Sequence, residues 1–183
     1  MIQIKNAAEL QKMRKACAIS AAALKAGGEA IEPGITTAEI DKIIYDFIVR
    51  HGARPNFLHL YGFPATACIS VNDTVIHGIP SKQQQIRPGD IVSIDTGCKI
   101  DGFNGDNACT YGCGKLDLEA QRLLDVTKES LHRGIEMARG GNRVGDIGHA
   151  VQSYVEENGF SVVRSFVGHG VGKELHELSL IHI

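Results

Sequence analysis

Two aspartates lie where a β-hairpin would bring them together. Asp101-Gly102 separates two segments typical of strands, IVSIDTGCKI and FNGDNACTY, and an Asp-Gly pair in that place indicates a two-residue hairpin turn. Opposed residues then have numbers that sum to 203, so Asp95 and Asp106 become diagonal neighbours on one face, with Cα atoms about 7–8 Å apart. Two such carboxylates repel each other unless a proton or cation lies between them. Because Asp95 also interrupts an apolar run, the pattern favours a metal-binding pair over two solvated carboxylates.

Histidines elsewhere in the chain could add to this site. His169 lies between two glycines, which leave room for the close approach of a metal or substrate, and an imidazole would shift the preference of two carboxylates toward transition metals. The alternative for His169 is a simple turn residue. GHGVG lacks the spacing of a phosphate-binding loop. His77 follows an apolar run and His176 follows GHGVGKEL, and for each a surface or core position is the alternative.

The remaining sequence predicts the elements that must position these residues. Asn6 with Glu9, and Thr36 with a glutamate three positions on, have the pattern of a capping box at a helix start. The helices that follow should end at Gly27-Gly28 and Gly52. Further helices are predicted at about 117–138 and 144–158, and strands at ACISVN, TVIHGI and SVVRSFV.

The second half of the chain repeats the first. A shift of 107 positions carries Gly34 to Gly141 and Gly52 to Gly159, and it also superimposes the apolar positions of the helices between them. This pattern predicts two duplicated α/β halves with a site between them. The first half continues 61 residues from Gly52 to Cys113, whereas 24 residues follow Gly159, so we expect the second half to be incomplete.

Composition excludes several classes of protein. The 183 residues are 43% hydrophobic and 22% charged, as in globular proteins, and the net charge of -2 provides no electrostatic footprint for nucleic acid or an anionic membrane. No apolar run approaches the ~20 residues of a membrane span, and the start lacks a signal-peptide pattern. Five cysteines without a C-x-x-C pair predict free thiols and a cytoplasmic location.

Three segments together carry a resemblance to a known family. ACISVNDTVIHGIP, PGDIVSIDTGCKIDGFNGD and GFSVVRSFVGHGVGKELHE resemble, in order, the type I methionine aminopeptidases. The resemblance runs from about residue 2 to Glu177. It implies an α+β pita-bread fold, with duplicated α/β halves around an antiparallel sheet, the second half being incomplete here. One catalytic domain would span 1–183, with 178–183 as a tail foreign to the family.

The resemblance also implies an activity and its site. The activity is removal of the initiator methionine by hydrolysis at two divalent ions (Co²⁺, Mn²⁺, Fe²⁺ or Zn²⁺). The substrates are nascent polypeptides with an N-terminal methionine, which the enzyme would encounter at the ribosome. The enzyme would be a cytoplasmic monomer that binds neither nucleic acid nor membrane. The residues implied are the metal ligands Asp95, Asp106 and His169, the catalytic and substrate-contacting histidines His77 and His176, and the methionine-pocket residues Phe63 and Cys68, with Leu60 in place of the family's usual tyrosine.

The end of the chain departs from the family pattern. Two glutamates expected after the histidine motif, a general base and a bridging ligand, are absent, and LSLIHI does not resemble the family's continuation. We therefore expect a C-terminally truncated fragment without activity. Two alternatives remain. An Xaa-Pro aminopeptidase is disfavoured by the lack of a large N-terminal domain, and a non-catalytic peptide- or protein-binding homologue is disfavoured by the retained ligands.

Overall fold

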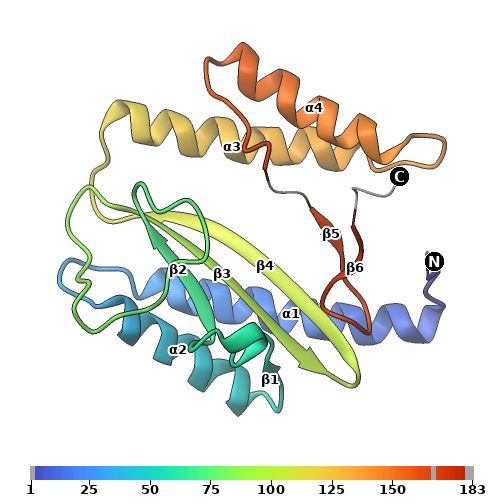
Figure 1. Cartoon of the computed structure of the whole chain (residues 1–183), viewed down its shortest axis with the longest axis horizontal. Helices are drawn as coiled ribbons and strands as arrows, with labels where there is room; N and C mark the ends of the chain where they lie inside the picture. The colour runs from blue at the N-terminus through green and yellow to red at the C-terminus, as the bar shows by residue number, and fades with distance from the viewer. Residues whose placement is uncertain (1–2, 166–167, 180–183) are drawn as a thin grey trace. The chain divides into compact units, whose positions relative to one another are not determined.

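The computed structural model describes residues 3–165 and 168–179, which form two compact units (Figure 1). The first unit runs from the N-terminus to Leu116 and includes Gly170–Leu178. The second includes Asp117–His169. Within the described ranges, no helix has the length and apolar character needed to cross a bilayer.

Two capped helices begin the first unit, α1 (Ala7–Glu29) and α2 (Thr37–Arg50). The Asn6 side chain accepts a hydrogen bond from Glu9 N at 3.0 Å, and the Glu9 carboxylate accepts one from Asn6 N at 3.0 Å. Thr36 forms the same reciprocal pair at the start of α2. Both predicted capping boxes are therefore confirmed. Each satisfies backbone donors that the first helical turn leaves free.

The sheet of the first unit is built around β3 (Ile91–Ile100), which pairs antiparallel with β4 (Phe103–Gly112). The other edge of β3 pairs with β2 (Ala67–Val71) and β1 (Arg54–Pro55), which the short 3₁₀ helix η1 (Leu60–Gly62) separates along the chain. Every β3–β4 pair sums to 203, from Ile100 opposite Phe103 outward, so the predicted hairpin and its register are confirmed.

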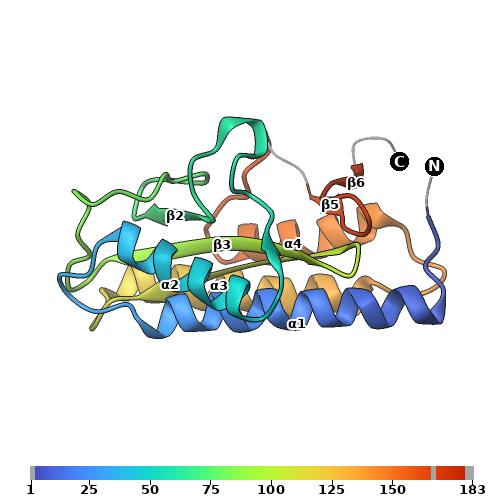
Figure 2. The ribbon, with the colours of Figure 1, turned by 90° about the horizontal axis from the view of Figure 1, so that it is seen from below.

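Alternation along β3 separates an apolar face from a polar one. Val92, Ile94 and Cys98 are fully buried with Ile40 and Ile44 of α2 in one core. Figure 2 shows α1 and α2 on the same side of β3. Since successive side chains point to opposite faces, the odd-numbered residues of β3 lie on the face away from these helices.

The second unit repeats the helical pair. Its helices are α3 (Leu118–Met137) and α4 (Val144–Glu157), both as predicted, and a shift of 107 positions carries the bounds of α2 onto those of α4. Gly34 and Gly141 have φ of 97° and 96°, and Gly52 and Gly159 have 71° and 76°. Matching left-handed glycines at both ends of the matching helices confirm the repeat. Two short strands, β5 (His169–Gly170) and β6 (Glu177–Ser179), pair with each other.

Two strand predictions are wrong. TVIHGI is a loop, because Asn72 and His77 take left-handed φ values of 54° and 58° that interrupt an extended chain. SVVRSFV has no strand in its described part, residues 161–165, where most side chains are exposed. Residues 166–167 of that segment, and 180–183 of the predicted tail 178–183, lie outside the described residues.

Candidate metal-binding site

Asp95 and Asp106 lie on the face of the hairpin that points away from α1. Asp95 is opposite Ala108, and Asp106 is opposite Gly97. Gly105, the neighbour of Asp106, faces α1 so closely that an added Cβ would lie 2.5 Å from the Ala16 carbonyl carbon. Asp106 must therefore point to the opposite face, which the strand period also assigns to Asp95. The hairpin brings the two carboxylates together as diagonal neighbours, and both are half-buried.

The negative charges of both aspartates affect the pKa of one neighbouring thiol, that of Cys68. Cys68 lies directly opposite Asp95 in the β2–β3 ladder and is 6% exposed. Burial and, to a smaller extent, the negative charges of Asp95, Asp106 and Asp41 together raise the pKa of Cys68 to about 12. The thiol is protonated at neutral pH and is therefore not a ready thiolate ligand.

Glycine at position 97 lets a neighbouring segment pack closely on this face beside the aspartates. A Cβ at Gly97 would lie 2.9 Å from Gly105 O and 3.1 Å from Asn56 Nδ2. A side chain at position 97 would therefore press on the segment that lies over the hairpin. This requirement for glycine was not predicted, although the break that Gly97 makes in a β-branched strand is a signal for close approach.

His77 is held in a strained conformation beside β2. Its φ of 58° places a non-glycine residue in the left-handed region, which costs about 1–3 kcal/mol and is concentrated at functional sites. The next residue fixes it: Ile69 N donates to Gly78 O at 2.9 Å, and Gly78 N donates to Ser70 Oγ at 3.1 Å. The exposed His77 side chain therefore extends from a backbone that is bonded, through Gly78, to Ile69 and Ser70, the two residues that follow Cys68.

The loop that carries His176 is anchored on the aspartate face. Asn104 N donates to Gly172 O at 2.8 Å, and Asn104 Nδ2 donates to the carbonyls of Gly172 and Lys173, each at 2.9 Å. Lys99 Nζ donates to Lys173 O at 2.7 Å. Lys99 and Asn104 are opposed in the hairpin, one step along the same face from the Gly97–Asp106 pair. The first unit therefore places the exposed His176 on a loop fixed next to the aspartates.

His169 is not brought to the pair by the described geometry. It belongs to the second unit, while both aspartates belong to the first, so its role as a ligand stays a prediction. No group of three or more His, Cys, Asp or Glu side chains within 3–165 and 168–179 is arranged to hold a metal. The two convergent carboxylates nevertheless fit a divalent cation, since they supply hard oxygen donors where their own charges repel.

A cavity of about 470 Å³ lies in the first unit beside this face. Leu58, Leu60 and Leu175 contribute apolar lining, and Asn56 and Asn104 contribute polar lining. Asn56 Nδ2 is a buried donor without a hydrogen-bond acceptor among the described residues.

Neither Phe63 nor Cys68 lines this cavity. Phe63 is half-buried and Cys68 is buried. Their place in a methionine pocket stays a prediction.

The chain resembles proteins of one family in sequence and in structure. It matches metallopeptidase family M24 over residues 11–183. It is 51% identical to the methionine aminopeptidase of Clostridium perfringens over 177 residues, which are 97% of this chain and 71% of that protein. The structure of methionine aminopeptidase from Thermotoga maritima superposes with a TM-score of 0.96 at 40% identity, covering 98% of this chain and 73% of that one. Prolidase from Pyrococcus furiosus gives 0.84 at 25% identity, covering 95% and 50%.

An α+β pita-bread fold with paired carboxylates on its hairpin defines a metal-dependent exopeptidase, which confirms the predicted fold class. The chain belongs to metallopeptidase family M24. Eight of its curated relatives are methionine aminopeptidases, at 41–51% identity.

Proposed function

We propose that the protein is a methionyl aminopeptidase, which hydrolyses the first peptide bond of polypeptides that begin with methionine. The observation that carries the proposal is the β3–β4 register, which places Asp95 and Asp106 on one face within a chain 51% identical to a methionine aminopeptidase. The substrates are nascent polypeptides with an N-terminal Met, met at the ribosome.

Asp95, Asp106 and His169 would hold divalent ions, two in the full site, with Co²⁺, Mn²⁺, Fe²⁺ and Zn²⁺ as the candidates. When bound, such ions lower the pKa of a water molecule toward neutrality and polarise the scissile carbonyl. Asp106 would bridge the ions and Asp95 would chelate one of them. Their shared face supports these roles.

His77 and His176 act on the substrate. Each ring can donate a hydrogen bond, His77 near the scissile amide and His176 to the oxygen that gains negative charge during attack. Preorganisation is the physical requirement for such donors. The left-handed backbone at His77 and the anchored loop at His176 both support it.

The methionine side chain of the substrate would bind among apolar residues beside Asp95 and Asp106. Cys68, directly opposite Asp95, together with Phe63 would line its pocket, and the neighbouring cavity at Leu60 and Leu175 would extend it. Leucine at position 60 makes that wall aliphatic.

A monomer in the cytoplasm is the proposed setting. All five cysteines are free thiols, as expected in a reducing compartment.

The test compares three polypeptides on a Met-Ala-Ser peptide with Mn²⁺ or Co²⁺. These are residues 1–183, the same residues followed by the C-terminal segment of the Clostridium perfringens relative, and that extended chain with Asp106→Asn. We expect turnover by the extended chain and its loss in the variant. Release of an N-terminal residue from Ala-Pro-Ser but not from Met-Ala-Ser would contradict the proposal and indicate proline-directed cleavage.

A further inference from the structure

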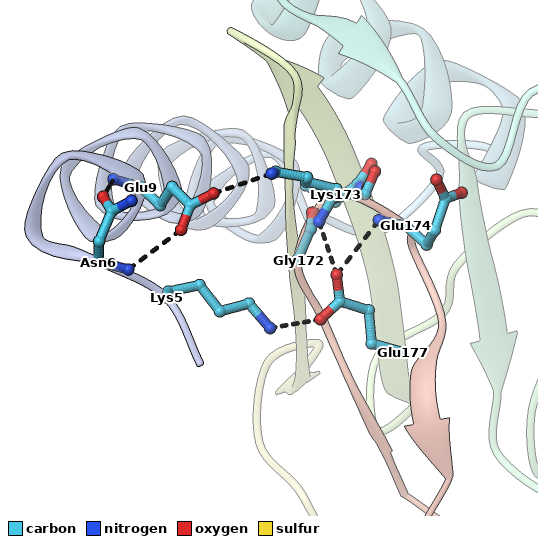
Figure 3. A network of polar contacts seen from close by, with 8 residues as sticks. Lys5, Asn6, Glu9, Gly172, Lys173, Glu174 and Glu177 are labelled. Carbon is cyan, nitrogen blue, oxygen red and sulfur yellow. Dashed lines mark hydrogen bonds and ion pairs between the residues drawn. The ribbon is translucent and has the colours of Figure 1, made fainter. Parts of the chain in front are cut away.

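One carboxylate closes the loop that carries His176 (Figure 3). Glu177 Oε1 accepts a hydrogen bond from Lys173 N at 2.8 Å and a weaker one from Glu174 N at 3.5 Å. Its other oxygen, Oε2, forms an ion pair with Lys5 Nζ. The same side chain therefore ties the loop to itself and to the segment that precedes α1.

The loop is shaped around this carboxylate. A Cβ at Gly172 would lie 2.2 Å from Glu177 Oε1, so only glycine leaves space for the carboxylate there. Gly172 N also donates to Glu174 O at 3.0 Å, and Gly172 O accepts from Asn104. The loop is thus held from the β4 side and from the α1 side at once.

A second ion pair also joins the 172–177 loop to the start of α1. Lys173 Nζ lies 2.8 Å from Glu9 Oε1, while Glu9 Oε2 accepts from Asn6 N within the capping box of α1. The hydrogen bond with Lys173 lowers the pKa of Glu9, and the one with Lys5 lowers the pKa of Glu177.

The two pairs differ in exposure. The side chains of Lys5 and Glu177 are 19% and 14% exposed, whereas those of Lys173 and Glu9 are 55% and 24% exposed. Solvent screens exposed pairs, which contribute little to stability. The shielded Lys5–Glu177 pair, with its two backbone donors, is therefore the contact that can fix loop geometry.

We propose that Glu177 is a positioning residue for His176, acting through closure of the 172–177 loop and through Lys5. The consequence for catalysis rests on the proposed function of His176. The loop geometry does not depend on it. Nothing in the sequence pattern pairs Lys5 with Glu177, which are separated by 172 positions.

The first readout is hydrogen exchange of the 172–177 backbone in the 183-residue chain, which needs no activity. We expect Glu177→Ala to accelerate exchange at the Lys173 amide about tenfold or more, because that amide loses its acceptor. Glu177→Gln keeps an acceptor oxygen, so its exchange rate at the Lys173 amide should lie between those of wild type and Glu177→Ala. Lys5→Met alters no loop residue and should also accelerate exchange. The matched control is Glu29→Gln, which removes the exposed Lys25–Glu29 pair from the other end of α1.

The second readout is a split between kcat and KM in the extended chain. Misplacement of a reacting group by about 1 Å can cost 10²-fold. We expect Glu177→Ala to lower kcat about 10-fold to 100-fold with KM changed less than about threefold, and Glu177→Gln to recover part of that loss. Unchanged exchange at Lys173 in both Glu177→Ala and Lys5→Met would overturn the proposal, as would equal kcat in Glu177→Ala and Glu29→Gln. An extended wild-type chain without turnover would instead contradict the proposed function, and the exchange result would still decide the loop.

Discussion

Cys68 lies directly opposite Asp95 in the ladder between β2 and β3. The residue predicted for the methionine pocket and a residue predicted for the metal pair therefore share one step of the sheet. If both predictions hold, the register of β2, β3 and β4 puts the methionine side chain of the substrate beside the metal.

The same pairing predicts the reactivity of the cysteines. With its pKa raised to about 12, Cys68 has almost no thiolate at pH 8 and is shielded by burial. Iodoacetamide should modify the exposed Cys109 before Cys68 in the folded chain. Peptide mapping by mass spectrometry after a short pulse checks the order, and faster labelling of Cys68 would contradict the account of its environment.

Asp41 of α2 is predicted to fix the start of β2. Its Oδ1 accepts from Thr66 N at 2.9 Å and from Ala67 N at 2.8 Å. Asp41→Ala would leave both donors without an acceptor and should lower the free energy of unfolding by about 1–3 kcal/mol.

Asp41→Asn should behave differently, because an amide oxygen can still accept. Burial is the largest influence on the pKa of Asp41 and raises it above the ordinary value, although the two backbone donors lower it. The folded protein therefore binds this proton more tightly than the unfolded chain does. Stability from Asp41 is fully present below the unfolded pKa and is lost as pH rises through the raised folded pKa. Urea unfolding from pH 3.5 to 7 should show Asp41→Asn gaining stability relative to wild type as pH rises. A relative loss would contradict this sign.

His77 and His176 are predicted to serve the substrate rather than the metal. Replacing either by Ala in the extended chain should lower kcat by roughly 10²–10³, the range for loss of one oxyanion donor. Metal content, measured by elemental analysis, should stay the same. A metal position emptied by His77→Ala would show that His77 is a ligand.

Local signals account for what could be predicted. Asp101-Gly102 sets a two-residue turn, which fixes the register of ten residue pairs and with it the neighbourhood of Asp95 and Asp106. The capping boxes at Asn6 and Thr36 fix where two helices begin.

The features that could not be predicted depend on backbone geometry and on contacts between residues far apart in the sequence. TVIHGI has strand composition, but the left-handed φ of His77 breaks the extended chain and makes the segment a loop. The Lys5–Glu177 pair joins two ends of the chain, and no period or motif marks it.

A polypeptide of these 183 residues alone is predicted to bind at most one ion and to lack significant turnover. The resemblance implies five protein ligands, and three of these, Asp95, Asp106 and His169, occur in the sequence. A missing general base would by itself cost about 10²–10⁴-fold. Assay of Met-Ala-Ser with the short and the extended chain side by side checks this, and equal turnover would contradict it.

The paired-aspartate metal site is tested by calorimetric titration of Mn²⁺ into the extended chain and its Asp95→Asn and Asp106→Asn variants. We expect two ions per wild-type chain and loss of the tight two-ion isotherm in each variant. The apo fold should be at least as stable as wild type, since each change removes a repulsion between the carboxylates. The control is Asp101→Asn, which alters the exposed turn of the same hairpin and should leave binding unchanged. Tight binding of two ions by either site variant would contradict the assignment of Asp95 and Asp106 as one metal site.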